Sequence, residues 1–364
     1  MSTELPRVDV AVVGGGVIGL AAAWRARRRG LEVAVLERGT FGQGASRAAA
    51  GMLAPVAEAD LQERDLLTAN LESARRWPAF ARELADVAGV DVGYRACGTL
   101  LVARDRDEAE HVEHERDVRE RLGLRVERML GSAARRLEPA LAPSLRLAVA
   151  LPDDHAVEPL RVVAALVEAC RRAGVRLIEG FEVGDLSALP ADRVVVAAGA
   201  WSGGFGDGRT AGIPVRPVKG QSLRLRDPSG PGLCDRVLRF EGGYLVPRGD
   251  GRYYLGATVE ERGFDDAVTA LGVYELLREA SEILPGILEL ELEETLTGFR
   301  PGTPDNAPVI GADPRDDRIV WATGHYRNGI LLCPVTADWV AAELAGEGAD
   351  HALRPDRFVK EPAA

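Results

Sequence analysis

A glycine-rich turn near the start of the chain constrains its fold more than any other feature. The short apolar segment Val8 to Val13 leads into Gly14-Gly15-Gly16-Val17-Ile18-Gly19, which has the spacing G-x-G-x-x-G. Where such a turn joins a strand to a helix, its glycines allow a tight turn, a close approach of the backbone to a pyrophosphate, and close packing of helix on strand. The phosphates then lie at the helix N-terminus, where free N–H groups favour an anion.

The residues after this turn complete a dinucleotide-binding pattern. An alanine-rich helix is predicted from Leu20 to Arg29, capped by Gly30, and a second strand from Glu32 to Leu36. Glu37 follows that strand about 20 residues after the glycines, where the pattern places a carboxylate on the ribose hydroxyls of an adenosine. A purely structural glycine-rich turn is the alternative, and the position of Glu37 favours the dinucleotide.

The composition is that of an acidic globular protein. The 364 residues are 46% hydrophobic and carry a net charge of −11, which allows two domains and argues against nucleic acid as a partner. Four scattered cysteines without a C-x-x-C pair indicate a reduced intracellular protein. No signal peptide and no apolar stretch long enough to span a bilayer is found, so we expect a cytoplasmic protein without a membrane partner.

The small-residue run from Gly39 to Gly51 has two interpretations. It is either a flexible linker or a wall of the cofactor site, where Ala45 or Ser46, near a second helix start, brings backbone N–H groups to the same pyrophosphate. Both alternatives stay open on the residues alone, with the cofactor wall favoured.

Helical patterns follow this run. A helix pair broken near Pro78 is expected between Asp60 and Val87. His111 and His114 stand three residues apart on a charged helix, which could present two metal ligands. Without a third candidate ligand nearby, a solvated helix face is favoured, and no metal site is predicted.

The later part of the chain is predicted to add strands to the same sheet and to contain an inserted region. Arg193 to Gly199 is a continuous β-branched run, typical of a parallel strand buried on both faces, and its end lies at the sheet edge where ligands bind in open α/β folds. Between about Pro214 and Leu296, alternating patterns and glycine turns predict an inserted antiparallel sheet. A second glycine-rich turn, Thr323 to Leu331, opens the last helix.

These segments, in this order, resemble the flavin-dependent D-amino-acid-oxidase-like oxidoreductases, in particular the branch that oxidises glycine for thiamine biosynthesis. The resemblance covers almost the whole chain and is carried by VVGGGVIG at 12–19, Glu37, SRAAAGML at 46–53, VVVAAGAWSG at 194–203, PVKGQ at 217–221, YLVPR at 244–248, GFRPGTPDNAPVIG at 298–311 and ATGHYRNGILL at 322–332. AAAGML and GHYRNGILL are far more specific than G-x-G-x-x-G, which does not distinguish NAD from FAD.

The resemblance implies an α/β (α+β overall) fold in which a Rossmann-like FAD-binding domain of the glutathione-reductase type carries an inserted antiparallel-sheet substrate domain. The FAD-binding domain is expected to be discontinuous, with residues 1–75, 150–213 and 297–364. The substrate-binding domain takes residues 76–149 and 214–296.

The resemblance also implies which residues hold FAD. They are Gly14, Gly16, Val17, Ile18, Gly19, Glu37, Arg38, Ala45, Ser46, Ala50, Gly51, Met52, Val183, Gly199, His325, Tyr326, Arg327, Asn328, Gly329, Ile330 and Leu331. The last segment is expected to place backbone amides near the flavin pyrimidine, where negative charge accumulates on reduction. Similar sarcosine oxidases attach their flavin through a cysteine near the position of Arg300 to Thr303, where this chain has none, so non-covalent FAD is expected.

Three residues are expected to act on the substrate. Arg300 matches an arginine that grips an amino-acid carboxylate bidentately and so fixes the Cα–H bond against the flavin. Tyr244 matches a tyrosine that hydrogen-bonds the same carboxylate, and Arg327 either polarises the substrate or braces its loop. Hydride transfer from the neutral amine requires no strong general base, so His325 and Glu58 are not expected to be essential acid or base groups.

The implied activity is FAD-dependent oxidative deamination of glycine, another small amino acid or N-methylglycine. The products would be an imine, then glyoxylate or a keto acid, with ammonia and hydrogen peroxide from oxygen, and the implied assembly is a homotetramer. The alternatives are a D-amino-acid or sarcosine dehydrogenase that uses another acceptor, and a non-catalytic flavin-binding subunit. Relatives can carry a histidine where this chain has Gly242-Gly243, so a more open site and a broader substrate range are expected.

Overall fold

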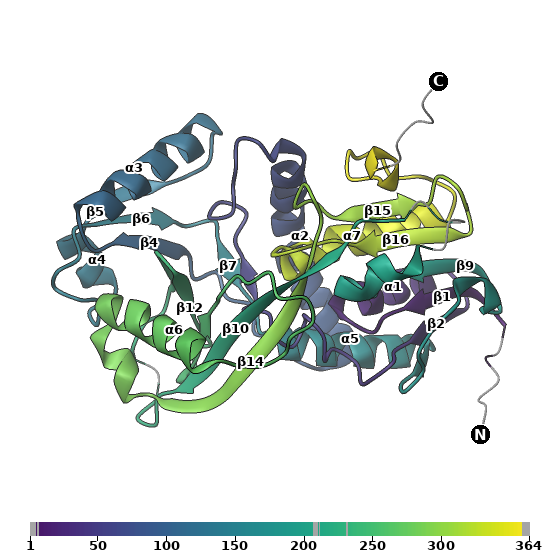
Figure 1. Cartoon of the computed structure of the whole chain (residues 1–364), viewed down its shortest axis with the longest axis horizontal. Helices are drawn as coiled ribbons and strands as arrows, with labels where there is room; N and C mark the ends of the chain where they lie inside the picture. The colour runs from purple at the N-terminus through teal and green to yellow at the C-terminus, as the bar shows by residue number, and fades with distance from the viewer. Residues whose placement is uncertain (1–4, 6, 207–209, 211, 231, 359–364) are drawn as a thin grey trace.

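Two large β-sheets organise the protein. The computed structural model describes residues 5, 7–206, 210, 212–230 and 232–358. Within them, a six-stranded and an eight-stranded sheet lie toward opposite ends of the molecule, with helices packed on both (Figure 1). The α/β fold class predicted from the sequence is confirmed.

The first sheet contains the glycine-rich turn. Its strand order is β15-β16-β9-β1-β2-β8, and all neighbours are parallel except β15 and β16. The strands are β1 (Val8–Val13), β2 (Val33–Leu36), β8 (Arg176–Ile178), β9 (Ala191–Val196), β15 (Val309–Ala312) and β16 (Ile319–Thr323). As its continuous β-branched run predicts, β9 is central, and Val194, Val195 and Val196 are fully buried.

Four helices share a core with one face of this sheet. They are α1 (Val17–Arg28), α2 (Arg64–Ala88), α5 (Pro159–Ala173) and α7 (Gly329–Leu344). The predicted break near Pro78 is wrong, because α2 is one continuous helix of 25 residues. Its Trp77 is buried and donates a hydrogen bond from Nε1 to the Leu331 carbonyl at 2.8 Å. Packing against α5 and α7 therefore keeps the helix intact across the proline.

The second sheet is antiparallel except for the pair β11 and β4. Its order is β14-β10-β13-β12-β11-β4-β6-β5. The strands are β4 (Thr99–Ala103), β5 (Glu127–Leu130), β6 (Leu147–Leu151), β10 (Arg216–Arg226), β11 (Val237–Phe240), β12 (Gly243–Pro247), β13 (Arg252–Gly256) and β14 (Glu291–Gly302). Helices α4 (Gly131–Leu137) and α6 (Ala270–Ile283) pack in one apolar core of the sheet, and α3 (Arg106–Arg121) packs in another. A separate short pair joins β3 (Met52–Leu53) to β7 (His155–Ala156).

Three of the four predicted domain limits fall inside secondary-structure elements. The limit at 149/150 cuts β6 and the limit at 296/297 cuts β14, although both strands belong wholly to the second sheet. The limit at 75/76 cuts α2, whose Trp77 and Phe80 lie in the core of the first sheet. The division into two domains stays a prediction, and the ends of these three elements are its natural limits.

The glycine turn holds three backbone segments in close contact. Gly14 has a φ of +108°, and a Cβ atom there would lie 2.4 Å from the Ala197 carbonyl oxygen at the end of β9. A Cβ at Gly19 would lie 2.0 Å from the Gly14 carbonyl oxygen. The first and third glycines therefore do what the sequence pattern requires of them: one makes the turn, and the other lets α1 approach it.

Gly19→Ala is expected to lower the free energy of unfolding by roughly 1–3 kcal/mol, because the added methyl group forces α1 away from the turn. Thermal or chemical unfolding measures the effect. Gly232→Ala is the matched control, since a Cβ at Gly232 meets nothing within 4 Å. Equal stability of the two variants would contradict the close approach described here.

Candidate active site

A cavity of about 1580 Å³ opens between the two sheets. Its walls come from the carboxyl edge of the first sheet, from the 37–52 segment, and from β10, β12 and β14 of the second sheet. Most of the predicted site residues line it, namely Gly14, Gly16, Val17, Ile18, Glu37, Arg38, Ala45, Ser46, Ala50, Gly51, Met52, Val183, Gly199, Tyr244, Arg300, His325, Tyr326, Arg327, Asn328, Gly329 and Ile330. Residues more than 300 positions apart in the chain thus share one wall.

Two predicted cofactor residues do not line this cavity. Gly19 packs α1 on the turn, as described above. Leu331 is 1% exposed in the core between the helices, and its carbonyl accepts hydrogen bonds from Ser73 Oγ at 2.6 Å and Trp77 Nε1 at 2.8 Å. Both residues support the wall from behind.

The N-terminus of α1 faces the cavity with a hydroxyl group beside it. No acidic residue lies in the first turn of the helix, and the Val17 N–H donates to Ser46 Oγ at 3.0 Å. Ser46 lies in a series of turns and not at the second helix start expected from the sequence. Because its oxygen accepts from Val17, its own O–H is directed elsewhere and can donate to an anion at this helix end.

Glu37 and Arg38 follow β2 at the same end of the cavity. The Glu37 carboxylate accepts hydrogen bonds from the backbone N–H groups of Gly15 at 2.8 Å and Gly39 at 2.9 Å. The Arg38 guanidinium stacks 3.9 Å from the centroid of the Trp201 ring. Trp201 follows β9 and also lines the cavity. Its contact with Arg38 was not predicted from the sequence.

The second glycine-rich turn forms another part of the wall. It leads from β16 through His325 and Tyr326 into α7, which has no acidic residue in its first turn. Tyr326 has a φ of +45° and donates its backbone N–H to the Pro301 carbonyl at 3.0 Å. His325 is buried, with Nε2 3.0 Å from Thr336 Oγ1, and burial lowers the pKa of its imidazole to about 3. The imidazole is therefore neutral at physiological pH.

These residues fit FAD. The N-termini of α1 and α7 both border the cavity without a neighbouring acid in the first turn. Their first N–H groups have no partner within the helix and favour negative charge. Ser46 and Val17 would hold the diphosphate, Glu37 and Val183 the adenosine, and the segment from His325 to Ile330 the flavin.

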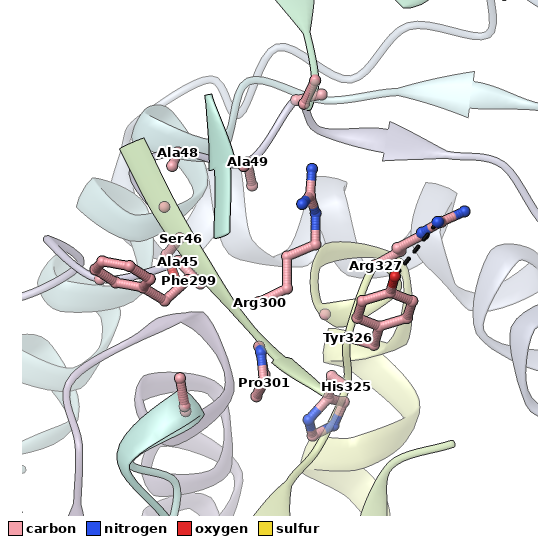
Figure 2. Close-up of a pocket in the computed structure, with 18 of the residues that line it drawn as sticks. Ala45, Ser46, Ala48, Ala49, Phe299, Arg300, Pro301, His325, Tyr326 and Arg327 are labelled. Carbon is pink, nitrogen blue, oxygen red and sulfur yellow. Dashed lines mark hydrogen bonds between the residues drawn. The ribbon is translucent and has the colours of Figure 1, made fainter. Parts of the chain in front are cut away.

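Arg300 and Tyr244 both line the cavity from the second sheet. In Figure 2, the Arg300 side chain projects from β14 between Ala49 and the turn that carries Tyr326 and Arg327. Its Nη1 donates to the carbonyl oxygens of Thr258 at 3.1 Å and Lys219 at 3.3 Å. In the described part of the chain Nε and Nη2 meet no acceptor, so donors remain for a carboxylate.

Tyr254 is a neighbour of Tyr244 that sequence reasoning missed. The two rings are stacked with centroids 6.3 Å apart, and the Tyr254 hydroxyl donates to the Ala48 carbonyl. Burial, together with the nearby Tyr244, raises the pKa of Tyr254, so it stays protonated. The signal that could have found it is the hairpin register: Val246 pairs with Tyr254, which places Tyr244 and Tyr254 on one face of the sheet.

Arg327 belongs to an ionic group with Glu58 and Arg239 in the cavity wall. Glu58 forms an ion pair with Arg239 and lies 3.7 Å from Arg327 Nη1. Burial acts to raise the pKa of Glu58, but the two guanidinium groups outweigh it and the pKa is lowered. Glu58 is therefore a fixed negative charge. Arg239 was not singled out in the sequence because its role depends on this tertiary contact.

Asp154 lies behind this group and holds the loop that carries Glu58. Its carboxyl oxygens accept hydrogen bonds from the backbone N–H groups of Val56 at 2.9 Å and Ala57 at 3.1 Å. Burial raises the pKa of Asp154 from 3.8 to about 7, although these two N–H groups act in the opposite direction.

The described residues add two observations on alternatives raised by the sequence. They contain no group of three His, Cys, Asp or Glu side chains arranged to hold a metal ion, and His111 lies exposed near Glu115. Among the same residues there is also no helix with the length and apolar character needed to cross a membrane.

The first sheet, its glycine turns and the shared cavity are those of a dinucleotide-dependent oxidoreductase, and the second sheet closes the other side of the cavity. Residues 9–343 match the family model described as FAD dependent oxidoreductase. The chain belongs to this family, and it is an FAD-dependent amine oxidoreductase.

Individual relatives agree with this assignment. The chain is 36% identical over 349 residues to a glycine oxidase of Geobacillus kaustophilus, and the match covers 92% of each chain. The crystal structure of glycine oxidase from that organism superimposes with a TM-score of 0.91 and 34% identity, covering 99% of this chain and all of the other. The bifunctional protein ThiO/ThiG of a Synechocystis species is 35% identical over 373 residues, which is 96% of this chain but only 54% of that protein.

The raised pKa of Asp154 predicts a pH dependence of stability. Between about pH 4 and pH 7 the folded protein keeps a proton that the unfolded chain releases, so the free energy of unfolding falls as the pH rises, by on the order of 4 kcal/mol at most. Asp154→Asn removes this contribution, and denaturant unfolding at several pH values measures it. The control is Asp153→Asn, whose carboxylate is exposed and paired with Arg125. An unchanged slope in Asp154→Asn would show that the buried carboxyl does not hold this proton.

Proposed function

We propose that the protein oxidises the amine of glycine, another small amino acid or N-methylglycine, with non-covalent FAD and with oxygen as electron acceptor. The expected products are an imine, then glyoxylate or a keto acid, with ammonia and hydrogen peroxide. One observation carries the proposal: the unpaired donors of Arg300, beside Tyr244, face the same cavity as the residues that fit FAD. The similarity to glycine oxidases supports the choice of substrate.

Arg300 orients the substrate. Its planar guanidinium can bind both oxygens of a carboxylate, and the Tyr244 hydroxyl can donate to one of them. With the carboxylate fixed, the α-carbon and its C–H bond point from β14 toward the part of the wall formed by the His325 turn. When bound there, FAD supplies the hydride acceptor, so the contribution of the protein is mainly position.

Neither His325 nor Glu58 is suited to strong acid or base catalysis. The pKa of His325, about 3, keeps the imidazole neutral, and Glu58 is bound by Arg239. The substrate amine therefore reacts in its neutral form, after losing its proton to solvent. The stacked rings of Tyr244 and Tyr254 form an uncharged part of the cavity wall on the side of the second sheet.

The part of the cavity wall formed by Gly242 and Gly243, called the lip here, supports a substrate range that is not limited to glycine. Both glycines line the cavity and present no side chain. We place the reaction in thiamine biosynthesis, because the chain resembles the ThiO part of a protein in which ThiO and ThiG are fused. The cytoplasmic location and the homotetramer stay predictions.

Anaerobic addition of glycine is expected to bleach the flavin absorbance, and aerobic turnover is expected to release hydrogen peroxide. A panel of glycine, N-methylglycine and D-proline defines the substrate range. Bleaching of the flavin and reduction of a dye, without release of peroxide, would show that the enzyme uses an electron acceptor other than oxygen. No bleaching by any amine would favour a non-catalytic flavin-binding subunit.

Arg300→Ala is expected to raise KM for glycine about 100-fold, because the charge-assisted pair with the carboxylate is lost. Tyr244→Phe removes one neutral hydrogen bond and should raise KM about 5-fold. Steady-state peroxide production measures both effects. Arg7→Ala is the control, since the Arg7 side chain is 81% exposed and does not line the cavity. An unchanged KM in Arg300→Ala would refute the carboxylate role.

A further inference from the structure

The segment from Thr258 to Thr269, between β13 and α6, lies along the cavity and is called the strap here. Thr258, Val259, Glu260, Arg262 and Thr269 of the strap line the cavity. Phe264 at its middle stacks on Trp201, which follows β9 of the first sheet, with ring centroids 4.9 Å apart and an interplanar angle of 15°. The strap therefore joins the two sheets beside the substrate position.

A buried lysine anchors the strap. Lys219 of β10 is one of only two lysines in the chain, and its side chain is fully buried. Its Nζ donates to the Ala267 carbonyl at 2.7 Å and to Asp265 Oδ2 at 3.1 Å, and lies 3.8 Å from Glu260. Burying an ammonium group is costly unless it is paired, so these contacts hold the strap firmly to β10.

Gln221, two residues after Lys219 on β10, provides a second attachment of the strap. Gln221 Nε2 donates to Glu260 Oε1 at 2.7 Å, and Gln221 Oε1 accepts from the Thr269 N–H at 2.7 Å. The backbones also pair, because Lys219 and Glu260 exchange two N–H to carbonyl hydrogen bonds of 3.0 Å. The strap is thus fixed at residue 260, at 265–267 and at 269.

Arg300 rests on the surface that this attachment creates. Its Nη1 donates to the Thr258 carbonyl of the strap and to the Lys219 carbonyl of β10. Gly220 lies under the guanidinium, where a Cβ atom would be only 2.5 Å from Nη1. The arginine lies across a glycine and donates to two backbone oxygens, one of the strap and one of β10, so only the first depends on the pairing of the strap with β10.

We propose that Lys219 is a positioning residue for substrate binding: by anchoring the strap it fixes the Thr258 carbonyl, and through that oxygen it fixes the guanidinium of Arg300. The inference rests on the proposed carboxylate role of Arg300. Without the anchor, the guanidinium samples several orientations and must be ordered again each time a carboxylate binds. The cost falls on substrate binding and not on hydride transfer once the substrate is in place.

Lys219→Met keeps an unbranched side chain, one atom shorter, but removes its charge, and is expected to raise KM for glycine about 10-fold with kcat changed less than 2-fold. Asp265→Asn removes one partner of the ammonium from the exposed side of the strap, and is expected to raise KM about 3-fold. This second variant keeps the proposal testable where Lys219→Met fails to fold. The neighbouring exposed Asp266→Asn is the matched control and should leave both constants unchanged.

A double-mutant cycle separates positioning from general damage to the fold. In an Arg300→Ala background, Asp265→Asn or Lys219→Met should have no further effect on the Kd for acetate, measured by the shift of the flavin spectrum, because the group through which it acts is gone. Additive effects would overturn the proposal, as would a fall in kcat with an unchanged KM. If Arg300→Ala itself binds acetate and glycine with normal affinity, the proposed function is refuted. If Arg300→Ala binds them weakly but Asp265→Asn and Lys219→Met bind them with normal affinity, only the positioning role is refuted.

Discussion

The close approach of backbone to backbone at Gly14 is the constraint on which the rest of the structure depends. It brings the end of β9 against the start of α1, so the ends of the central strands β1, β9 and β16 and the N-termini of two helices meet at one edge of the first sheet. Polar N–H groups gather there without acidic side chains in the first helical turns. An extended anionic cofactor neutralises this edge, and the buried β-branched strands behind it keep the edge rigid.

The second sheet turns this cofactor site into a substrate site. β10 and β14 are its longest strands and pair along almost their whole length, with Val218 opposite Arg300. Arg300 therefore stands in a fixed register and not on a mobile loop. The ionic group of Glu58, Arg239 and Arg327 lies in the same cavity, and its excess of one positive charge adds to that of Arg300. Under the proposed function this local positive charge suits the substrate carboxylate, although acidic residues such as Glu241, Glu275 and Glu279 line other parts of the cavity.

Local patterns predicted much of this arrangement and tertiary contacts decided the rest. The glycine spacing, Glu37 and the turn at His325 were predictable because each depends on a strand, a turn and a helix that adjoin in sequence. Tyr254, Arg239 and Lys219 were not, because their neighbours come from other strands whose register only the folded sheet defines. Pro78 shows the opposite case. The local rule for proline predicted a break in the helix, but the helix is continuous because Trp77 is buried between neighbouring helices.

One backbone hydrogen bond has a consequence for chemical selectivity. The Pro301 carbonyl, one residue after Arg300, accepts the N–H of Tyr326 in the turn that fits the flavin. The main chain thereby fixes the position of β14 next to Arg300 relative to that turn. Under the proposed function, this arrangement sets the reach between the bound carboxylate and the carbon that is oxidised, and the extra methylene of a β-amino acid changes that reach. The enzyme should therefore distinguish α- from β-amino acids by the length of their backbone, whatever side chain the open lip admits.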